Sequence, residues 1–202
     1  MKFNPDSTFF KITTTISQFI VLNICYLIVC LPIITIGSAT SALFSVTMHY
    51  ADHEKGYLVI VFLKHIKENW KYSSLIFLSL LLPIVALSYS GIFWIKLNSS
   101  IFSMLVGIIA LFIAFYLSIA LIYGLALIGR FDAPFQQTIQ NALYLPLTEP
   151  FRSLLFVLVF ITIAALLSLI PGLRLIWALF GFSFTSYCFA FLFLTIFKKY
   201  EA

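Results

Sequence analysis

Charged residues are scarce in this chain of 202 residues: they make up 9% of it, whereas a soluble domain carries about 25%. Apolar residues make up 62%, and the mean hydropathy is +1.10. A globule of this size has too much surface to hide so many apolar side chains from water. A lipid bilayer is the solvent that suits this composition, so we expect an integral membrane protein.

Paired cysteines and catalytic motifs are lacking as well. Cys25, Cys30 and Cys188 lie inside apolar runs, and an odd count without paired spacing favours neither a disulfide framework nor a zinc site. No phosphate loop, nucleophile elbow or dinucleotide fingerprint appears in the sequence. These absences predict that the chain is not an enzyme and holds no cofactor.

Acidic residues are few, and the histidines are the remaining candidates for metal ligands. No carboxylate lies within an expected span, which argues against a proton-coupled carrier. His49 and His53 are four residues apart, so they share one face of a helix, and this spacing can hold a metal ion. Two solvated histidines at a helix end explain the same pattern more simply, so we predict no metal site.

The net charge of +5 comes from 12 Lys and Arg residues against 7 Asp and Glu residues. The basic residues are scattered between apolar runs and form no patch with interleaved aromatic residues, so they do not indicate a nucleic-acid partner. They are typical of topology signals at the ends of membrane spans. We therefore expect the lipid bilayer to be the main partner.

Runs without charge divide the chain into spans. A membrane-crossing helix needs about 20 residues, and four runs suit one crossing each: Tyr72–Ile95, Leu97–Gly129, Ser153–Leu173 and Leu175–Phe197. The run between Lys11 and Asp52 would be about twice as long as the hydrocarbon is thick if it formed one helix. The sequence therefore predicts an all-α, polytopic transmembrane helix bundle of about five spans, the first from about Thr13 to Ile36.

A proline, a glycine and several hydroxyl groups interrupt that first run. Pro32 lacks an amide hydrogen and crowds the preceding turn, and Gly37 relaxes the backbone. Hydroxyl side chains can satisfy backbone groups that a break sets free; here they are Thr35, Ser38, Thr40 and Ser41. We predict a break, with a new helix beginning near Ser38. Through Tyr50 this helix is too short to cross, so it would lie at the interface or dip into the bundle.

The distribution of basic residues sets the expected orientation. With five spans, most Lys and Arg residues fall on one side, leaving on the other Lys2, Lys11, Lys96 and Arg174. The more basic side should face the cytoplasm, which places the N-terminus outside and the C-terminus inside. In a six-span alternative residues 33–51 also cross, which moves Lys2 and Lys11 inside and fits this rule better.

Two segments on the cytoplasmic side have the pattern of amphipathic helices. In Leu58–Tyr72, the apolar face is Phe62, Leu63, Ile66 and Trp70, and the charged face is Lys64, Lys67, Glu68 and Lys71. In Asp132–Pro146, Asp132 is a suitable N-cap and Pro146 helps to end the helix. Such helices either lie on the inner leaflet or dock to a cytoplasmic partner.

The order of the expected elements suggests a duplication within a single transmembrane domain of residues 1–202. A span, a surface helix and a second span occur in residues 12–95 and again in residues 97–173, and a final span, 175–197, follows. The sequence identity between the two halves is slight, so the duplication is a hypothesis that rests on the order of the elements.

The interrupted run carries the clearest family resemblance. Leu22–Asn23 followed by Leu31–Leu43, LPIITIGSATSAL, resembles the signature of the YesL-like bacterial membrane proteins, a family of unknown function. Other positions that fit this family are Phe62, Lys64, Lys67, Asn69, Trp70, Arg130, Asp132, Asn141, Phe180–Ser183 and Phe197–Tyr200. His49 and His53 depart from its pattern, because relatives tend to carry Lys or Arg there.

The resemblance implies a multi-pass protein of the bacterial cell membrane with a part in sugar uptake, since family members often occur beside carbohydrate ABC importers. We therefore expect a non-enzymatic accessory component of oligosaccharide uptake, with ABC importer subunits as partners. The alternative is a self-contained transporter or channel for a neutral solute, in which the broken helix exposes backbone carbonyls. The candidate residues are Asn23, Pro32, Thr35, Gly37, Ser38 and Thr40 in the helix break, and Phe62, Lys64, Lys67, Asn69, Trp70, Arg130, Asp132 and Asn141 in the surface helices.

Overall fold

The computed structural model describes residues 8–52, 57–97 and 100–201, and the regular elements in these ranges are all helical. They are α1 (Thr8–Val29), the 3-10 helix η1 (Ile33–Thr35), α2 (Ile36–Ala51), α3 (Leu58–Leu97), α4 (Ile101–Arg130), α5 (Phe135–Thr148), α6 (Pro150–Leu169) and α7 (Leu173–Glu201). The predicted all-α class is therefore confirmed.

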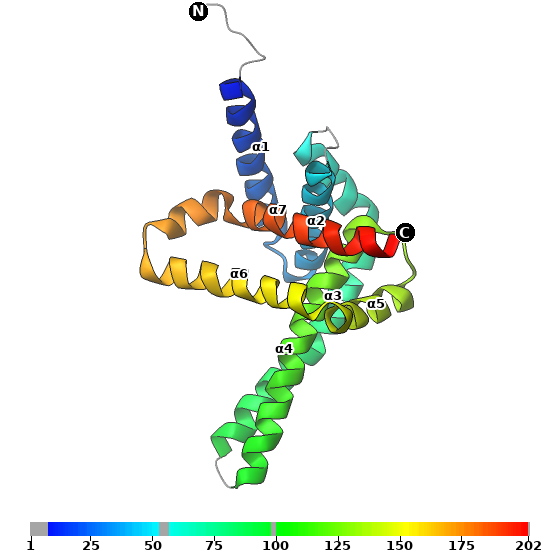
Figure 1. Ribbon diagram of the computed structural model, residues 1–202, viewed down its shortest axis with the longest axis vertical. Helices are drawn as coiled ribbons and strands as arrows, with labels where there is room; N and C mark the ends of the chain where they lie inside the picture. The colour runs from blue at the N-terminus through cyan, green and yellow to red at the C-terminus, as the bar shows by residue number, and fades with distance from the viewer. Residues whose placement is uncertain (1–7, 53–56, 98–99, 202) are drawn as a thin grey trace, which may run out of the picture.

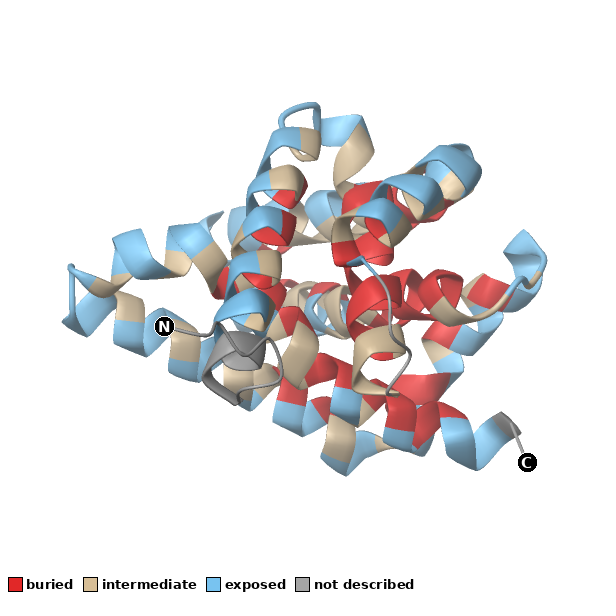
Figure 2. Cartoon of the chain, turned by 90° about the horizontal axis from the view of Figure 1, so that it is seen from above, coloured by how far each residue is buried: buried red, intermediate tan, exposed pale blue. Residues whose placement is uncertain are grey.

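The helices radiate from a common centre (Figure 1). α3 and α4 form a long antiparallel hairpin that extends downward, α6 and α7 form a second hairpin that projects to the left, and α1 rises above. α2 lies where these parts meet, in contact with α1, α3, α4 and α7. Most of its residues from Gly37 to Met48 are buried as a result, and Figure 2 shows the buried residues gathered in this central region.

Four of the described helices, α3, α4, α6 and α7, are long and apolar enough to cross a membrane, by length and composition. Many of their large apolar side chains are exposed, including Ile101, Phe112 and Leu169, as expected of a surface that faces lipid. The expected first span corresponds to α1, whose described apolar part, Thr13–Val29, is shorter. α2 has 16 residues, about 24 Å, so it gives no support to a sixth crossing.

α3 differs from the sequence prediction, which divided it into a surface helix, Leu58–Tyr72, and a span, Tyr72–Ile95. The structure has one helix of 40 residues, about 60 Å long and twice the thickness of the hydrocarbon. Near Tyr72 the sequence changes from charged residues, which suit water, to apolar residues, which suit lipid. Lys, Glu and Leu all favour helix, however. No proline or glycine interrupts the chain there, so the helix continues.

α5 also begins and ends differently from the prediction. Its N-cap is Pro134, without a side-chain cap, so Asp132 does not cap the helix. Pro146 lies inside the helix rather than at its end. The helix continues to Thr148, whose hydroxyl group donates to the Leu145 carbonyl oxygen at 3.1 Å.

Glycine permits the close approach of helices at two points. Near the end of the α3–α4 hairpin, a Cβ atom on Gly107 would lie 2.8 Å from the Gly91 carbonyl oxygen. At the other end of α4, a Cβ atom on Gly129 would lie 2.9 Å from the Ser45 nitrogen of α2. Small residues at such crossings are the usual means by which membrane helices pack backbone against backbone.

Candidate functional site

The predicted helix break is present and lies between α1 and α2. α1 ends at Val29, and Pro32 precedes η1 in an extended conformation. The Thr35 hydroxyl group lies 2.5 Å from the Val29 carbonyl oxygen and 2.7 Å from that of Pro32. Ser38 donates to the Thr35 carbonyl oxygen at 2.9 Å. Hydroxyl groups therefore bind carbonyl groups at the break, as the sequence predicted, and the Pro32 carbonyl oxygen also accepts from the Thr35 backbone nitrogen at 3.1 Å.

Gly37 has a different role from the predicted one. It lies in the first turn of α2, in a helical conformation rather than a relaxed one. A Cβ atom on Gly37 would lie 2.3 Å from the Phe77 Cβ atom and 2.9 Å from the Ser73 carbonyl oxygen, both on α3. The missing side chain therefore allows α2 to contact the backbone of α3.

Thr40 and Asn23 join the break to neighbouring helices. The hydroxyl oxygens of Thr40 and Tyr26 are 3.3 Å apart, which links α2 to α1. The buried Asn23 amide donates to the Ala178 carbonyl oxygen of α7 at 2.8 Å and accepts from the Ser183 backbone nitrogen at 3.1 Å. A buried amide with both ends paired fixes α1 against α7.

The Asn23 contact unites two parts of the family resemblance that are far apart in sequence. Leu22–Asn23 belongs to the opening motif, and Phe180–Ser183 belongs to the last span. The Ser183 hydroxyl group also donates to the Phe19 carbonyl oxygen at 3.0 Å. This pairing could not be predicted, since a polar residue within a span carries no information about its partner.

The N-terminal half of α3 presents an exposed face of mixed apolar and basic character. Phe62 is fully buried and Ile66 is partly buried, but Leu63 and Trp70 are 50% and 45% exposed. These two residues lie among exposed lysines, with which they form what we call the α3 stripe: Ile60, Leu63, Lys64, Lys67, Trp70 and Lys71. Their spacing places them on one side of the helix. The predicted apolar face is therefore divided between the core and this surface.

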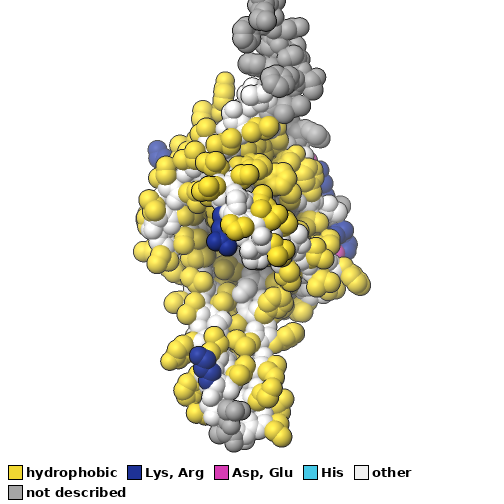
Figure 3. Space-filling model, turned by 90° about the vertical axis from the view of Figure 1, so that its left-hand side faces the viewer, with side chains coloured by type: hydrophobic (Ala, Val, Ile, Leu, Met, Phe, Trp, Pro, Cys, Tyr) yellow, Lys and Arg dark blue, Asp and Glu magenta, His cyan; other side chains and the backbone are white. Residues whose placement is uncertain are grey.

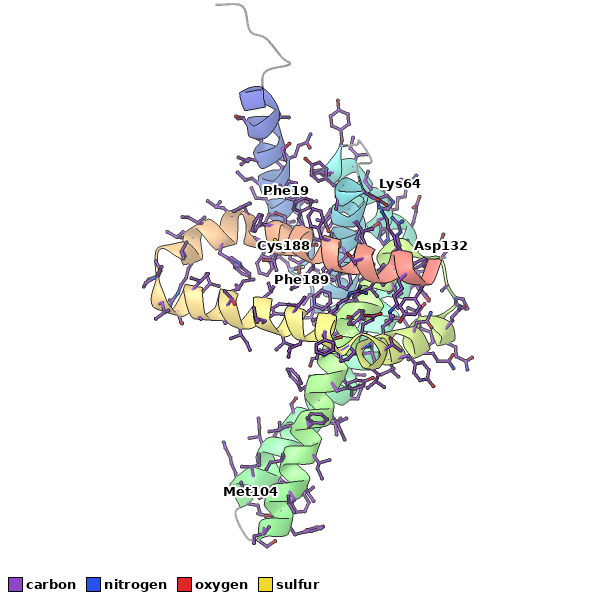
Figure 4. The ribbon with its side chains drawn as sticks, viewed as in Figure 1. Phe19, Lys64, Met104, Asp132, Cys188 and Phe189 are labelled. Atoms are coloured by element: carbon purple, nitrogen blue, oxygen red, sulfur yellow. The ribbon has the colours of Figure 1, made fainter. Side chains whose placement is uncertain are left out.

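The second group of predicted residues lies beside the α3 stripe. A cavity of about 220 Å³ is lined by residues of α3, α4 and the following loop, including Asn69, Tyr72 and Asp132. The Tyr72 hydroxyl group donates to the Ala133 carbonyl oxygen at 2.6 Å, which holds this loop against α3. Asn141 is exposed on α5 and does not line the cavity. Figure 4 shows Lys64 and Asp132 on the same side of the molecule, far from Met104 on the α3–α4 hairpin.

Ion pairs close the chain around this side of the molecule. Asp52, which follows α2, lies 3.3 Å from the Arg130 guanidinium group of α4 and 2.6 Å from the Lys198 ammonium group of α7. Mainly through its hydrogen bond to Lys198, Asp52 has a pKa lowered from the ordinary 3.8. Of these residues the prediction included only Arg130. Sequence alone could not pair groups that come together only when α2, α4 and α7 pack.

A second carboxylate acts in the same way at the junction of α5 and α6. Glu149 lies 2.5 Å from the Lys199 ammonium group and 3.2 Å from the Arg152 guanidinium group. The hydrogen bond from Lys199 is the largest cause that lowers the pKa of Glu149 from 4.5. The C-terminal end of α7 is therefore tied to two separate parts of the chain.

Of the histidine pair considered as a metal site, the structure describes only His49. His49 Nδ1 lies 2.7 Å from the Ser45 carbonyl oxygen of its own helix, while His53 lies outside the described residues. Among the described residues, no three side chains of His, Cys, Asp or Glu are placed to hold one metal ion.

Residues 19–91 match a protein family described as "Protein of unknown function, DUF624". This agrees with the resemblance to the YesL-like proteins, and the match includes the helix break, the buried Asn23 and the α3 stripe. No curated protein and no solved structure matches the chain. The matched region is thus the part of the fold in which α1, α2 and α3 pack together.

Proposed function

We propose, from the match of residues 19–91 to the family described as DUF624, that the chain is a non-enzymatic integral membrane protein that assists carbohydrate uptake by an ABC importer. The exposed α3 stripe is the observation that carries the proposal. A helix that buries Phe62 but leaves Trp70 exposed among lysines has a surface beyond what its own core needs. Tryptophan at the centre of such a surface is a frequent anchor of protein interfaces.

The continuity of α3 favours a protein partner over the surface of the inner leaflet. A separate amphipathic helix can lie flat on a membrane. The stripe instead belongs to a helix of 40 residues whose other half is apolar. If that half crosses the bilayer, the stripe extends from the membrane toward the aqueous phase. We infer that it contacts a subunit that lies beside the span.

The proposed orientation places the stripe and the C-terminus in the cytoplasm of a bacterial cell. The basic residues of the stripe lie on the same side of the molecule as the ion pairs at the end of α7. Lys96 and Arg174, in contrast, lie near the far ends of the two hairpins. An excess of basic residues on one side is the usual mark of the cytoplasmic face.

The helix break gives less support to a self-contained transporter. Broken helices in carriers turn their free carbonyl groups toward the substrate. Here the carbonyl oxygens of Val29 and Pro32 accept from Thr35, and that of Ile34 accepts from Ser74 at 2.8 Å. These contacts support a break that serves packing between helices.

Affinity purification from native membranes tests the proposal. The tagged wild-type chain should enrich a permease or ATPase subunit of a carbohydrate importer, and Trp70→Glu should reduce that enrichment several-fold, because a carboxylate replaces the apolar anchor. Tyr144→Glu is the matched control, since Tyr144 is an exposed aromatic residue of α5 outside the stripe. If no importer subunit is enriched, or if both variants behave like the wild type, the proposal is wrong. Solute flux into proteoliposomes of the pure chain would support the alternative.

A further inference from the structure

The α6–α7 hairpin is closed at its two ends and open between them. At its base, the ring of Phe189 lies 4.9 Å from that of Phe156 and 5.3 Å from that of Phe160, measured between centroids. At its turn, the Leu173 nitrogen donates to the Ile170 carbonyl oxygen at 3.0 Å. The two helices do not fill the space between these points with their own side chains.

Two neighbouring cavities occupy that space, and together we call them the groove. The larger, about 340 Å³, lies between α6, α7 and the centre of the bundle. The smaller, about 160 Å³, lies nearer the turn. Ile163, Leu167 and Trp177 line both, so the two cavities are adjacent. The larger cavity alone falls within the range of about 300–1,000 Å³ that is typical of ligand sites.

The lining of this groove suits a hydrocarbon chain better than a polar solute. Most of its residues are aliphatic or aromatic. Four hydroxyl residues line the larger cavity: Tyr26, Thr40, Thr185 and Ser186. Tyr26 and Thr40 pair with each other at 3.3 Å, and Ser186 pairs with Thr47 at 2.9 Å. A polar ligand would lose its hydration there and find few partners in return.

A lone positive charge lies beside the groove, at the turn of the hairpin. Arg174 is the only charged residue between Arg152 and Lys198. Its Nε atom donates to the carbonyl oxygen of Leu167 at 3.0 Å, which fixes the guanidinium group beside a residue that lines both cavities. Figure 3 looks toward this end of the hairpin and shows isolated basic side chains on a largely hydrophobic face. A guanidinium group binds phosphate through paired, charge-assisted hydrogen bonds.

We propose that the α6–α7 hairpin binds one anionic phospholipid, with an acyl chain in the groove and its phosphate at Arg174. The charge beside the groove and the apolar lining match the two parts of such a lipid. α6 and α7 are both apolar enough to cross a membrane, so a bilayer would supply this ligand at high concentration. The site does not depend on the proposed partner, because it lies away from the α3 stripe.

Quenching of Trp177 fluorescence by brominated lipid tests the site in the full chain. The other two tryptophans, Trp70 and Trp94, are replaced by phenylalanine, and the protein is titrated in maltoside micelles. Brominated phosphatidylglycerol should quench Trp177 saturably, and at a lower mole fraction than brominated phosphatidylcholine. Arg174→Gln should raise the half-saturating fraction of phosphatidylglycerol by about tenfold, since a charge-assisted contact is lost, and remove the preference between the two lipids.

Matched variants separate the groove from the rest of the surface. Ala164 lines the larger cavity and its neighbour Ala165 lines neither, so Ala164→Phe should weaken quenching by both lipids while Ala165→Phe leaves it unchanged. Lys96→Gln, at the end of the other hairpin, should have no effect. Helical circular dichroism shows whether each variant is folded. The proposal is overturned if quenching never saturates, which would mean a detergent tail only, if Ala164→Phe binds like the wild type, or if Arg174→Gln retains the lipid preference.

Discussion

Gly37 offers the sharpest test of how α2 and α3 pack. In Gly37→Ala, the new Cβ atom would lie 2.3 Å from the Phe77 Cβ atom, well inside the contact distance of about 3.5–4.0 Å between carbon atoms. A second close atom, the Ser73 carbonyl oxygen at 2.9 Å, belongs to the backbone and cannot rotate away. The helices must move apart, and such overpacking costs about 1–3 kcal/mol.

Gly124→Ala is the matched control, because it makes the same chemical change without the overlap. Its nearest neighbour would be the Ala142 Cβ atom at 3.4 Å. Alanine in place of helical glycine stabilises a helix by about 0.5–1 kcal/mol, and that gain is common to both variants. We therefore expect Gly124→Ala to be as stable as the wild type or more so, and Gly37→Ala to be less stable than Gly124→Ala by about 1–3 kcal/mol.

Thermal unfolding in detergent, followed by helical circular dichroism, measures the difference. For a chain of this size, 1 kcal/mol corresponds to about 2–4 °C in Tm. Equal midpoints for the two variants would refute the reasoning, because they would mean that α2 and α3 do not approach through Gly37.

Three further predictions concern polar groups. Asn23→Leu should destabilise the chain by about 1–3 kcal/mol in the same assay, because it removes two buried hydrogen bonds between α1 and α7; Ser17→Ala, which removes an exposed hydroxyl group, should change little. Thr35→Val should lower the stability by about 1 kcal/mol, since the Val29 carbonyl oxygen loses its hydrogen bond from the Thr35 hydroxyl group. The pKa values of Asp52 and Glu149 are lowered in the folded chain from 3.8 and 4.5. The ion pairs of Asp52 and Glu149 therefore stabilise the folded chain at pH values above 3.8 and 4.5. We expect Tm to fall as the pH drops through the lower pKa values of the folded state. The fall should be less steep in Asp52→Asn, which lacks one of the two carboxylates.

Local features of the sequence were enough to predict the helix break. Pro32 stops a helix by its own covalent structure, and a hydroxyl group such as that of Thr35 finds a backbone acceptor within a few residues. The apolar runs likewise predicted α4, α6 and α7, since length and hydropathy are properties of one segment. The continuity of α3 was missed because a change in polarity was read as a change in structure.

Contacts between distant segments could not be predicted in this way. Asn23 was recognised as a polar residue in a span, but its partners lie on α7. Asp52 joins groups from α4 and α7, and neither pairing follows from spacing. Gly37 was identified for the wrong reason, because only the position of Phe77 shows that the lack of a side chain matters more there than backbone freedom.

The small and hydroxyl-bearing residues of α2 lie where neighbouring helices approach it. Backbone atoms of α3 and α4 approach it at Gly37 and at Ser45, and the Thr47 hydroxyl group meets that of Ser186 on α7. Larger apolar residues would hold these three helices apart, and lipid would fill the gaps. α2 therefore fixes the position of α3, and through it that of the α3 stripe. Pro83 lies in the apolar half of α3 and removes one backbone hydrogen bond. The helix therefore bends most easily at this residue. The α3 stripe is separated from Pro83 by a continuous length of helix that packs against α2.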